Sequence, residues 1–289
     1  MKFIAIVLAV LIERFWPQVQ DVRKMDMFQR YIRAMRLFLG DSAAFDGVVG
    51  AVVALLPAII VIAWLQVVLS KGLLLLFGLV FAVVALVASI GPRDLLTLMK
   101  SYVEAVRRGD AVTAHERAGR LLGRAPPDDE AQRHRAVVRS LFSGVNDWFP
   151  CAVFWFAWFG PVGAVTFRLL ALMKDFAARE QPDSGFARGA RSLYDLAIWI
   201  PARITVLAYA FIGNFDDTVR AWRSAAKVDA SFGNSQAVLL AAGLGAAQLD
   251  RDDRAITVTD LQVCVALLRR TVIVWLVLFA LATLFGLLR

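Results

Sequence analysis

The chain has few of the residues that build metal centres and disulfide frameworks, with only two cysteines and two histidines among 289 residues. Cys151 and Cys264 lie beside or inside apolar stretches, far apart in the sequence, and form no CxxC pair. His115 and His134 share one polar segment, with no neighbouring cysteine and no HExxH pattern. We therefore expect no disulfide, no metal site built from protein ligands, and two histidines on the solvated surface.

The usual nucleotide-binding and hydrolase motifs are missing too. No glycine-rich segment ends in the Gly-Lys-Ser/Thr of a Walker loop, and no lysine follows Gly243 and Gly245. Closely spaced glycines in an apolar segment are instead typical of tight helix packing. No nucleophile motif accompanies the two histidines. These absences argue against a P-loop enzyme and against a Ser-His-Asp hydrolase.

Charge is absent from two long stretches. The run from Gly47 to Leu69 contains no charged side chain, and a second uncharged run, from Gly72 to Ile90, follows Ser70 and Lys71. A helix of about 20 apolar residues crosses the roughly 30 Å hydrocarbon layer of a bilayer. Buried helices of soluble proteins, in contrast, carry polar residues where they meet solvent. The pattern predicts a transmembrane hairpin.

The composition favours the same class, because 59% of the residues are hydrophobic, 19% are charged and the mean hydropathy is +0.63. The net charge of +8 is spread through every polar segment beside acids, without the clustered basic face of a nucleic-acid site. Six basic residues from Arg14 to Arg36 and ten from Arg93 to Arg139 flank the hairpin, against Lys71 alone at its turn. We expect a multi-pass protein of the bacterial inner membrane, with both hairpin ends in the cytosol, that contacts anionic headgroups and binds no nucleic acid.

The N-terminal region contains two further membrane candidates. The apolar run from Phe3 to Ile12 is too short to span and lacks a small-residue cleavage site, which favours a retained re-entrant or interfacial helix. From Val22 to Leu39, apolar residues recur at helical spacing between basic ones. This helix either lies on an anionic membrane face or packs against another helix.

Three later segments are apolar. The stretch from Phe149 to Phe167 is broken by Gly160 and Pro161, and the stretch from Ser192 to Gly213 contains Pro201. Basic residues lie between these two stretches, so the positive-inside bias favours shallow or re-entrant insertion of both, with the prolines as breaks. The uncharged stretch from Thr271 to Leu288 is predicted to span.

These segments predict an all-α, polytopic membrane protein with a small cytosolic helical subdomain. Its expected parts are an N-terminal region of apolar and basic helices (1–46), the hairpin (47–91), the cytosolic subdomain (92–147), membrane or re-entrant helices (148–213), a second cytosolic segment (214–270) and a final transmembrane helix (271–289).

Asp195 and Arg203 stand out because both charges lie in an apolar stretch, where they are costly unless paired or functional. Eight residues separate them by about 12 Å on an ideal helix, so they cannot pair directly unless Pro201 distorts the helix. Two interpretations stand: a structural ion pair with another helix, or an anion-binding or catalytic pocket. We predict that Asp147, Asp195, Arg203 and Asn234 converge on one cytosol-facing cavity at the membrane edge.

Four segments carry a resemblance to known membrane families: Leu11 to Phe15, Gly160 to Arg168, Asp195 to Thr205, and Gly233 to Gln236. Through their order and spacing the chain resembles the AmpE family of inner-membrane proteins, linked to β-lactamase induction. It is more distantly similar to the membrane cobinamide-phosphate synthases of cobalamin assembly. The resemblance covers nearly the whole chain, although each motif is weak by itself.

The chain departs from the synthase pattern at its acids. The synthases carry a Glu-Ser-Leu-Ala-Glu-Asn block ahead of an Asp-Gly pair, where this chain has Arg139 and Ser143 and keeps only Asp147. They also carry an Asn-Thr-Leu-Asp-Ser block, where this chain has Lys174 and Asp175. Carboxylates hold Mg²⁺ beside nucleotide phosphates, so these replacements should disable that arrangement.

The AmpE resemblance implies a noncatalytic signalling or scaffold protein in the cell-wall stress and β-lactam response, with no cofactor and a membrane or cell-wall-recycling protein as its partner. The alternative is a nucleotide-dependent, amide-forming enzyme similar to the synthases. In that case Arg203 would hold a phosphate, Asp147 or Asp195 would hold Mg²⁺ of ATP-Mg²⁺, and Asn234 would orient the substrate. The lost acids favour the noncatalytic interpretation.

Overall fold

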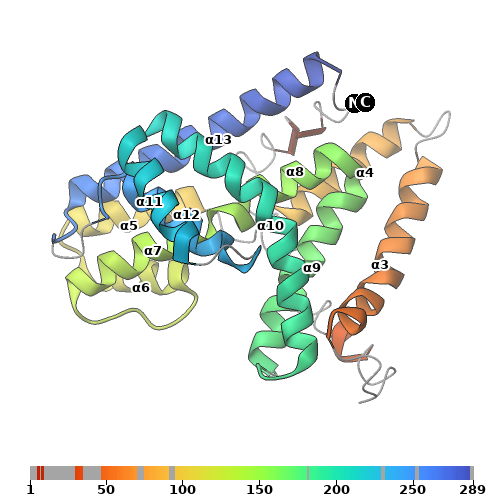
Figure 1. Cartoon of the computed structure of the whole chain (residues 1–289), viewed down its shortest axis with the longest axis horizontal. Helices are drawn as coiled ribbons and strands as arrows, with labels where there is room; N and C mark the ends of the chain where they lie inside the picture. Colours follow the sequence, from red (N-terminus) through yellow and green to blue (C-terminus); the bar gives the residue numbers. More distant parts are fainter. Residues whose placement is uncertain are drawn as a thin grey trace. The chain divides into compact units, whose positions relative to one another are not determined.

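A computed structural model of the chain describes residues 5–6, 8–9, 30–34, 47–69, 75–90, 95–180, 182–228, 232–250 and 254–286. All regular secondary structure within these ranges is helical, as Figure 1 shows. The predicted all-α class is therefore confirmed.

The chain forms two compact units that each combine distant parts of the sequence. The first unit contains residues 1–92, 151–198 and 279–289, and the second contains residues 93–150 and 199–278. Helices α10 (Gly185–Ile212) and α13 (Val258–Leu284) each contribute residues to both units.

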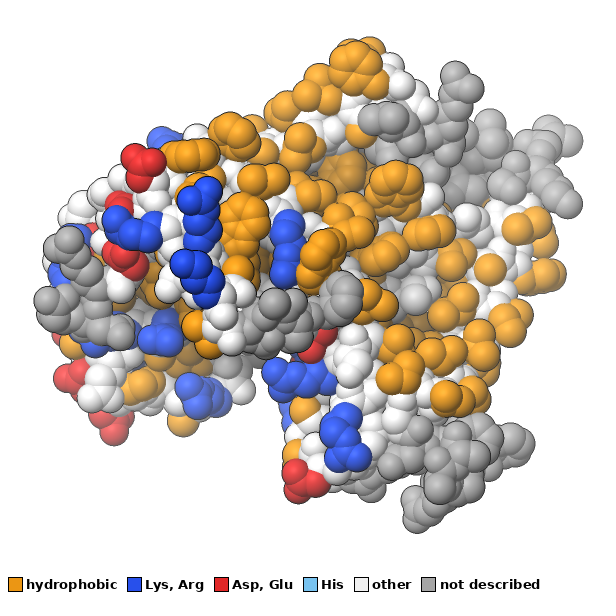
Figure 2. All heavy atoms as spheres, in the orientation of Figure 1, with side chains coloured by type: hydrophobic (Ala, Val, Ile, Leu, Met, Phe, Trp, Pro, Cys, Tyr) orange, Lys and Arg blue, Asp and Glu red, His pale blue; other side chains and the backbone are white. Residues whose placement is uncertain are grey.

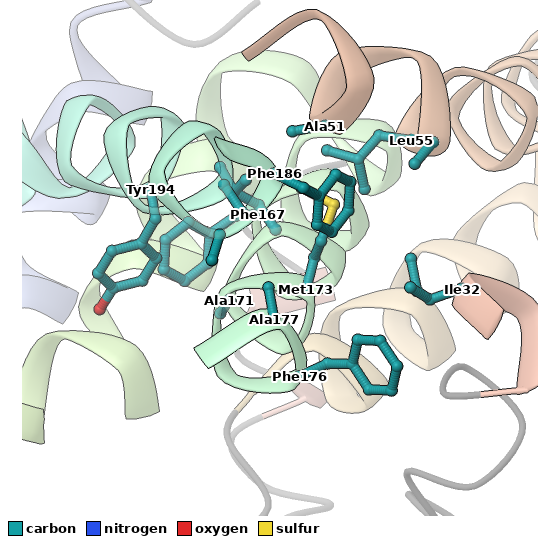
Figure 3. Packing of buried hydrophobic residues seen from close by; sticks show 14 of the residues in the cluster. Ile32, Ala51, Leu55, Phe167, Ala171, Met173, Phe176, Ala177, Phe186 and Tyr194 are labelled. Carbon is teal, nitrogen blue, oxygen red and sulfur yellow. The ribbon is translucent and has the colours of Figure 1, made fainter. Parts of the chain in front are cut away.

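The core of the first unit is built around α9 (Pro161–Glu180). Helices α3 (Gly47–Leu69) and α4 (Leu75–Ser89) both pack against it. Figure 3 shows α9 residues Phe167 and Met173 among buried apolar side chains from α3 and α10. The approach of α10 to α3 is close, since a Cβ atom on Gly189 would lie 2.2 Å from the carbonyl carbon of Gly47.

The second unit contains the subdomain predicted between residues 92 and 147. Its helices are α5 (Leu95–Arg107), α6 (Ala111–Leu122) and α7 (Glu130–Trp148), followed later in the chain by α11 (Phe215–Val228), the 3-10 turn Phe232–Asn234, and α12 (Ser235–Ala246). Helix α12 packs against both α7 and α11. Its glycines permit this, because a Cβ on Gly243 would lie 2.4 Å from the Phe142 ring.

Three helices are long and apolar enough to cross a membrane: α3, α10 and α13. Large apolar side chains on them are exposed, such as Ile60 and Trp64 on α3 and Phe211 on α10, as expected for contact with lipid. Membrane association is therefore confirmed. The described part of the second hairpin arm, α4, has 15 residues, or about 22 Å of helix, which is less than a full crossing.

The predicted break at Gly160 and Pro161 is present. Helix α8 (Pro150–Phe159) has only 10 residues, and Gly160 adopts φ +66° before α9 begins. A left-handed conformation of this kind costs glycine least, because glycine has no Cβ. Helix α8 is thus about 15 Å long, roughly half of the hydrocarbon layer.

The break predicted at Pro201 is absent. Helix α10 is one continuous helix of 28 residues that includes Pro201. Proline has no N–H to donate to the carbonyl four residues earlier, here that of Ala197. The indole Nε1 of Trp155 donates to this Ala197 oxygen at 3.2 Å. A side chain from α8 thereby satisfies the acceptor that the proline leaves without a partner.

The last helix begins earlier than the predicted start at Thr271. It starts at Val258 and continues through Arg269 and Arg270. Its first turn has reciprocal caps, because Thr257 N–H donates to the Asp260 carboxylate at 2.9 Å and Asp260 N–H donates to Thr257 Oγ1 at 3.3 Å. Arg254 also pairs with Asp260 at 2.9 Å.

The prediction that both histidines lie on the surface is wrong for His134, which is buried. Its Nδ1 donates to the Ile256 carbonyl at 3.1 Å, and its ring packs edge-on against Tyr102. These contacts offset the loss of solvent. The polar sequence around His134 could not reveal these contacts, because Ile256 is distant in the chain.

Of the two predicted N-terminal helices, only short parts lie within the described residues. In residues 30–34, Ile32 belongs to the first unit's core, and Tyr31 donates to the Ala54 carbonyl at 2.9 Å. Arg33 pairs with Glu180 at 3.0 Å. This part packs against other helices, as in the second of the two interpretations given for residues 22–39.

Candidate functional site

Arg203 is the candidate residue with the most informative surroundings. It lies on α10, half-buried, and its guanidinium carbon is 4.6 Å from the centre of the Trp199 ring. Its Nη1 donates to Ser235 Oγ at 2.6 Å and to the Trp199 carbonyl at 3.3 Å. The indole and the hydroxyl therefore orient a positive charge within an apolar stretch of α10.

Ser235 is the first residue of α12, so the guanidinium lies beside a helix N-terminus. That end carries no acid in its first turn, and the N-cap residue Asn234 makes no side-chain capping bond. A helix N-terminus has a partial positive charge, which adds to that of Arg203. The combined field attracts an anion.

The Asn234 side chain is buried, and its Nδ2 donates to the Ala225 carbonyl of α11 at 2.9 Å. This bond joins the start of α12 to the neighbouring helix. Ser235 is fully buried next to it. The two predicted residues Arg203 and Asn234 are thus brought to one corner of the second unit, with Ser235 between them as a contact that the sequence did not single out.

Asp195 lies in the first unit and pairs with another residue of α10. Its carboxylate is 3.8 Å from Nε of Arg191, one turn earlier in the helix. The ion pair with another helix, one of the two interpretations of these charges, stays a prediction. Convergence of Asp195 with the second-unit residues stays a prediction.

Asp147 lies in α7 of the second unit, and its neighbour Asn146 belongs to a buried polar network. The indole of Trp275 donates to Thr205 Oγ1 at 3.1 Å, and Thr205 in turn donates to Asn146 Oδ1 at 2.7 Å. All three residues are almost completely buried. The network joins α7, α10 and α13 close to the candidate Asp147, and no sequence signal linked these positions.

The residues that replace the synthase acids have other partners. Ser143 Oγ donates to the Ser140 carbonyl of its own helix at 3.3 Å, and Arg139 is exposed. The Lys174 ammonium lies 3.7 Å from the centre of the Tyr194 ring and 3.4 Å from the Asp175 carboxylate. A cation therefore lies at the position that the resemblance matches to a synthase acid. Among the described residues, no group of three or more His, Cys, Asp or Glu side chains could hold a metal ion.

Comparison with known proteins identifies a family. The model of the CobD/Cbib protein family matches residues 6–260. Cobalamin biosynthesis protein CobD of Chromobacterium violaceum is 29% identical over 198 residues, which cover 68% of this chain and 61% of that protein. The protein of the same name from Stutzerimonas stutzeri is 26% identical over 250 residues, covering 84% of this chain and 80% of the relative. No solved structure matches the chain.

These findings overturn the AmpE resemblance. All four motifs that suggested AmpE lie within the matched range, and the family model assigns that range to a different family. The links to signalling, β-lactamase induction and antibiotic resistance fall with the AmpE assignment. Since the family model covers most of the sequence, this chain belongs to the CobD/Cbib protein family.

Proposed function

We propose that the chain acts in cobalamin biosynthesis at the bacterial inner membrane, where it binds an anionic group of a corrinoid intermediate through Arg203. The pathway comes from the family and from the relatives named cobalamin biosynthesis protein CobD. The observation that carries the binding site is the position of the Arg203 guanidinium, which donates to Ser235 at the N-terminus of α12.

Electrostatics supports an anionic ligand. Two positive features next to each other repel, so the arrangement is more stable when an anion lies between or beside them. A phosphate or carboxylate oxygen accepts guanidinium and backbone N–H donors in charge-assisted hydrogen bonds. The Trp199 ring and the Ser235 hydroxyl limit the movement of Arg203, which reduces the entropy lost on binding.

Binding of a corrinoid tests this function. The full-length protein in nanodiscs is titrated with a purified corrinoid monocarboxylic acid and a corrinoid phosphate, each followed by its visible absorption. Arg203→Gln should weaken binding of the anionic corrinoid by about tenfold or more, the effect of losing one charge-assisted hydrogen bond.

Arg188→Gln is the matched control on the same helix, because Arg188 is exposed and its guanidinium donates to the nearby Asp183 carbonyl. It should leave the affinity unchanged. An unmodified protein that binds neither corrinoid would contradict the proposal, as would equal affinities for the Arg203→Gln variant and the unmodified protein.

Amide formation with a nucleotide, similar to the reaction of the cobinamide-phosphate synthases, is the second candidate. Family membership and the retained Asp147 favour it. The position of Lys174 does not suit the Mg²⁺ that such a reaction requires, because the ammonium would repel a second cation there. We therefore assign no reaction step to a metal-bound nucleotide.

Complementation separates the two candidates. The gene is expressed in a bacterium that lacks its own cobinamide-phosphate synthase, and corrinoid-dependent growth is measured. Restored growth that Asp147→Ala abolishes would establish amide formation. Absence of growth, together with corrinoid binding by the purified protein, would establish binding without that reaction.

A further inference from the structure

Helix α11 has an apolar stripe that does not face its packing partner. The stripe consists of Phe215, Val219, Trp222 and Ala226, at the i, i+4, i+7, i+11 spacing of one helix face. None of these four side chains is buried, and Phe215 is 56% exposed.

The face of α11 that packs on α12 is a different one. Gly245 of α12 lies against Asp217 O and the Ala221 Cβ, and Thr218 is fully buried. These positions are roughly 115° around the helix from the stripe, at about 100° per residue. The apolar stripe is therefore not explained by packing on α12.

Two exposed cations lie beside the stripe. Arg223 and Lys227 are exposed, and neither forms an ion pair with any residue in the described ranges. Arg220, in contrast, is neutralised by Asp217 and by Asp250 at 3.5 Å. Asp216 shares the basic side but lies in the first turn, where the helix dipole favours an acid. Figure 2 shows Lys and Arg side chains beside hydrophobic ones in the part of the molecule that contains α11 and α12.

The connection to α10 places α11 at a membrane surface. The candidate span α10 ends at Ile212, and α11 begins at Phe215 after only Gly213 and Asn214. Phe211, on the last turn of the span, is 78% exposed. A helix that starts this close to the end of a span has to begin within the interfacial layer of the bilayer.

Hydrogen bonds hold the direction of this turn. Asn214 N–H donates to the Ala246 carbonyl at 3.2 Å, and Asn214 Oδ1 accepts from Asp217 N–H at 3.0 Å. A Cβ on Gly213 would lie 2.7 Å from Ala246 O, so the chain is tightly packed there. These contacts fix the direction in which the chain turns from α10 into α11.

From these observations we propose that α11 lies in the headgroup layer and binds anionic phospholipid. Its apolar stripe enters the boundary with the acyl chains, and Arg223 and Lys227 contact the phosphates. The Ala225 carbonyl of α11 holds Asn234, the residue before Ser235. A lipid-bound α11 therefore also supports the corner that carries Arg203, although lipid binding does not depend on the proposed corrinoid function.

Spin labels on the full-length protein in nanodiscs test this inference. Cysteines are introduced as Val219→Cys on the stripe and Ser224→Cys away from it, while the native Cys151 and Cys264 are buried. Power saturation with oxygen and with a water-soluble nickel complex reports the depth of each label. In nanodiscs that contain phosphatidylglycerol, the label at position 219 should favour oxygen and the label at position 224 should favour nickel.

The second measurement is the affinity of the protein for phosphatidylglycerol, in vesicles or nanodiscs of increasing phosphatidylglycerol content. The phosphatidylglycerol that stays bound to the protein after lipid exchange is counted. The double variant Arg223→Gln and Lys227→Gln should weaken lipid retention on the order of 30-fold, given the usual contribution of each surface cation. The matched control, Lys100→Gln with Arg124→Gln, removes two other exposed cations of the same unit and should have little effect.

Three results would overturn the inference. The label at position 219 could favour nickel in anionic nanodiscs, which would place the stripe in water. It could be inaccessible to both reagents, which would show that protein covers the stripe. Equal lipid loss in the control variant would show that overall charge, and not α11, determines retention.

Discussion

Gln66 lies against the break between α8 and α9, and its Oε1 accepts a hydrogen bond from the backbone N–H of Val162 at 3.0 Å. The same side chain donates from Nε2 to the Phe159 carbonyl at 3.3 Å. The Gln66 side chain on α3 therefore bonds to one backbone N–H and one backbone carbonyl at the break between the two helices. Irregular backbone within an apolar layer requires such partners.

Replacement of Gln66 by leucine should destabilise the protein by roughly 1–3 kcal/mol, because both backbone groups lose their partner. Unfolding in mixed detergent micelles measures the change. Gln66→Glu keeps an acceptor for Val162 and should cost less if it is protonated in the apolar setting. Unchanged stability of the leucine variant would show that the break is satisfied by other groups.

Gly189→Ala should be strongly destabilising, by about 1–3 kcal/mol or more, since the added Cβ would overlap the Gly47 backbone. Gly144→Ala is the matched control within another helix, where a Cβ would meet nothing within 4 Å. There the better helix propensity of alanine should stabilise by roughly 0.5–1 kcal/mol. Thermal unfolding of the two variants should therefore shift in opposite directions, and shifts of the same sign would contradict this packing.

Thr205→Val should cost on the order of 1 kcal/mol, because it leaves the buried Trp275 N–H and Asn146 carbonyl without their shared hydroxyl. Thr271→Val provides the comparison, since Thr271 is equally buried but its hydroxyl donates to the Leu267 carbonyl of its own helix. A denaturant titration should rank Thr205→Val as the less stable variant. Thr205→Ser keeps the hydroxyl and should recover most of the loss.

Because Tyr102 is buried, we expect the protein to lose stability at alkaline pH. Burial raises the pKa of its phenol from the usual 10.0 to about 12, although the nearby Arg133 opposes the rise. As the pH rises, the phenol loses its proton in the unfolded state before it does in the folded state. Its contribution to the free energy of unfolding is therefore complete below pH 10 and is lost as the pH rises toward 12. The slope approaches about 1.4 kcal/mol per pH unit within that window.

Comparison with Tyr102→Phe isolates this effect, because the variant lacks the titrating hydroxyl. Its stability should decline less between pH 10 and pH 12, and absorbance near 295 nm should show one fewer high-pKa phenol. Identical pH profiles for the two proteins would show that the phenol does not titrate differently on folding.

The membrane class and the approximate places of the helices follow from local patterns in the amino-acid sequence. Uncharged runs such as Gly47–Leu69 have no stable alternative to an apolar environment, and Gly160 before Pro161 marks a break that any fold must accommodate. Arg203 was also recognisable, because a charge within an apolar helix is costly wherever it occurs.

The partners that satisfy these groups could not be predicted from local patterns, because they come from distant parts of the fold. Proline at position 201 predicts a break, yet the helix continues because Trp155 supplies the missing donor. The partners of Arg203 and His134 likewise come from distant segments, at Ser235 and Ile256. Local patterns indicate which polar groups of a segment require a partner. Which distant residue supplies that partner depends on how the helices pack.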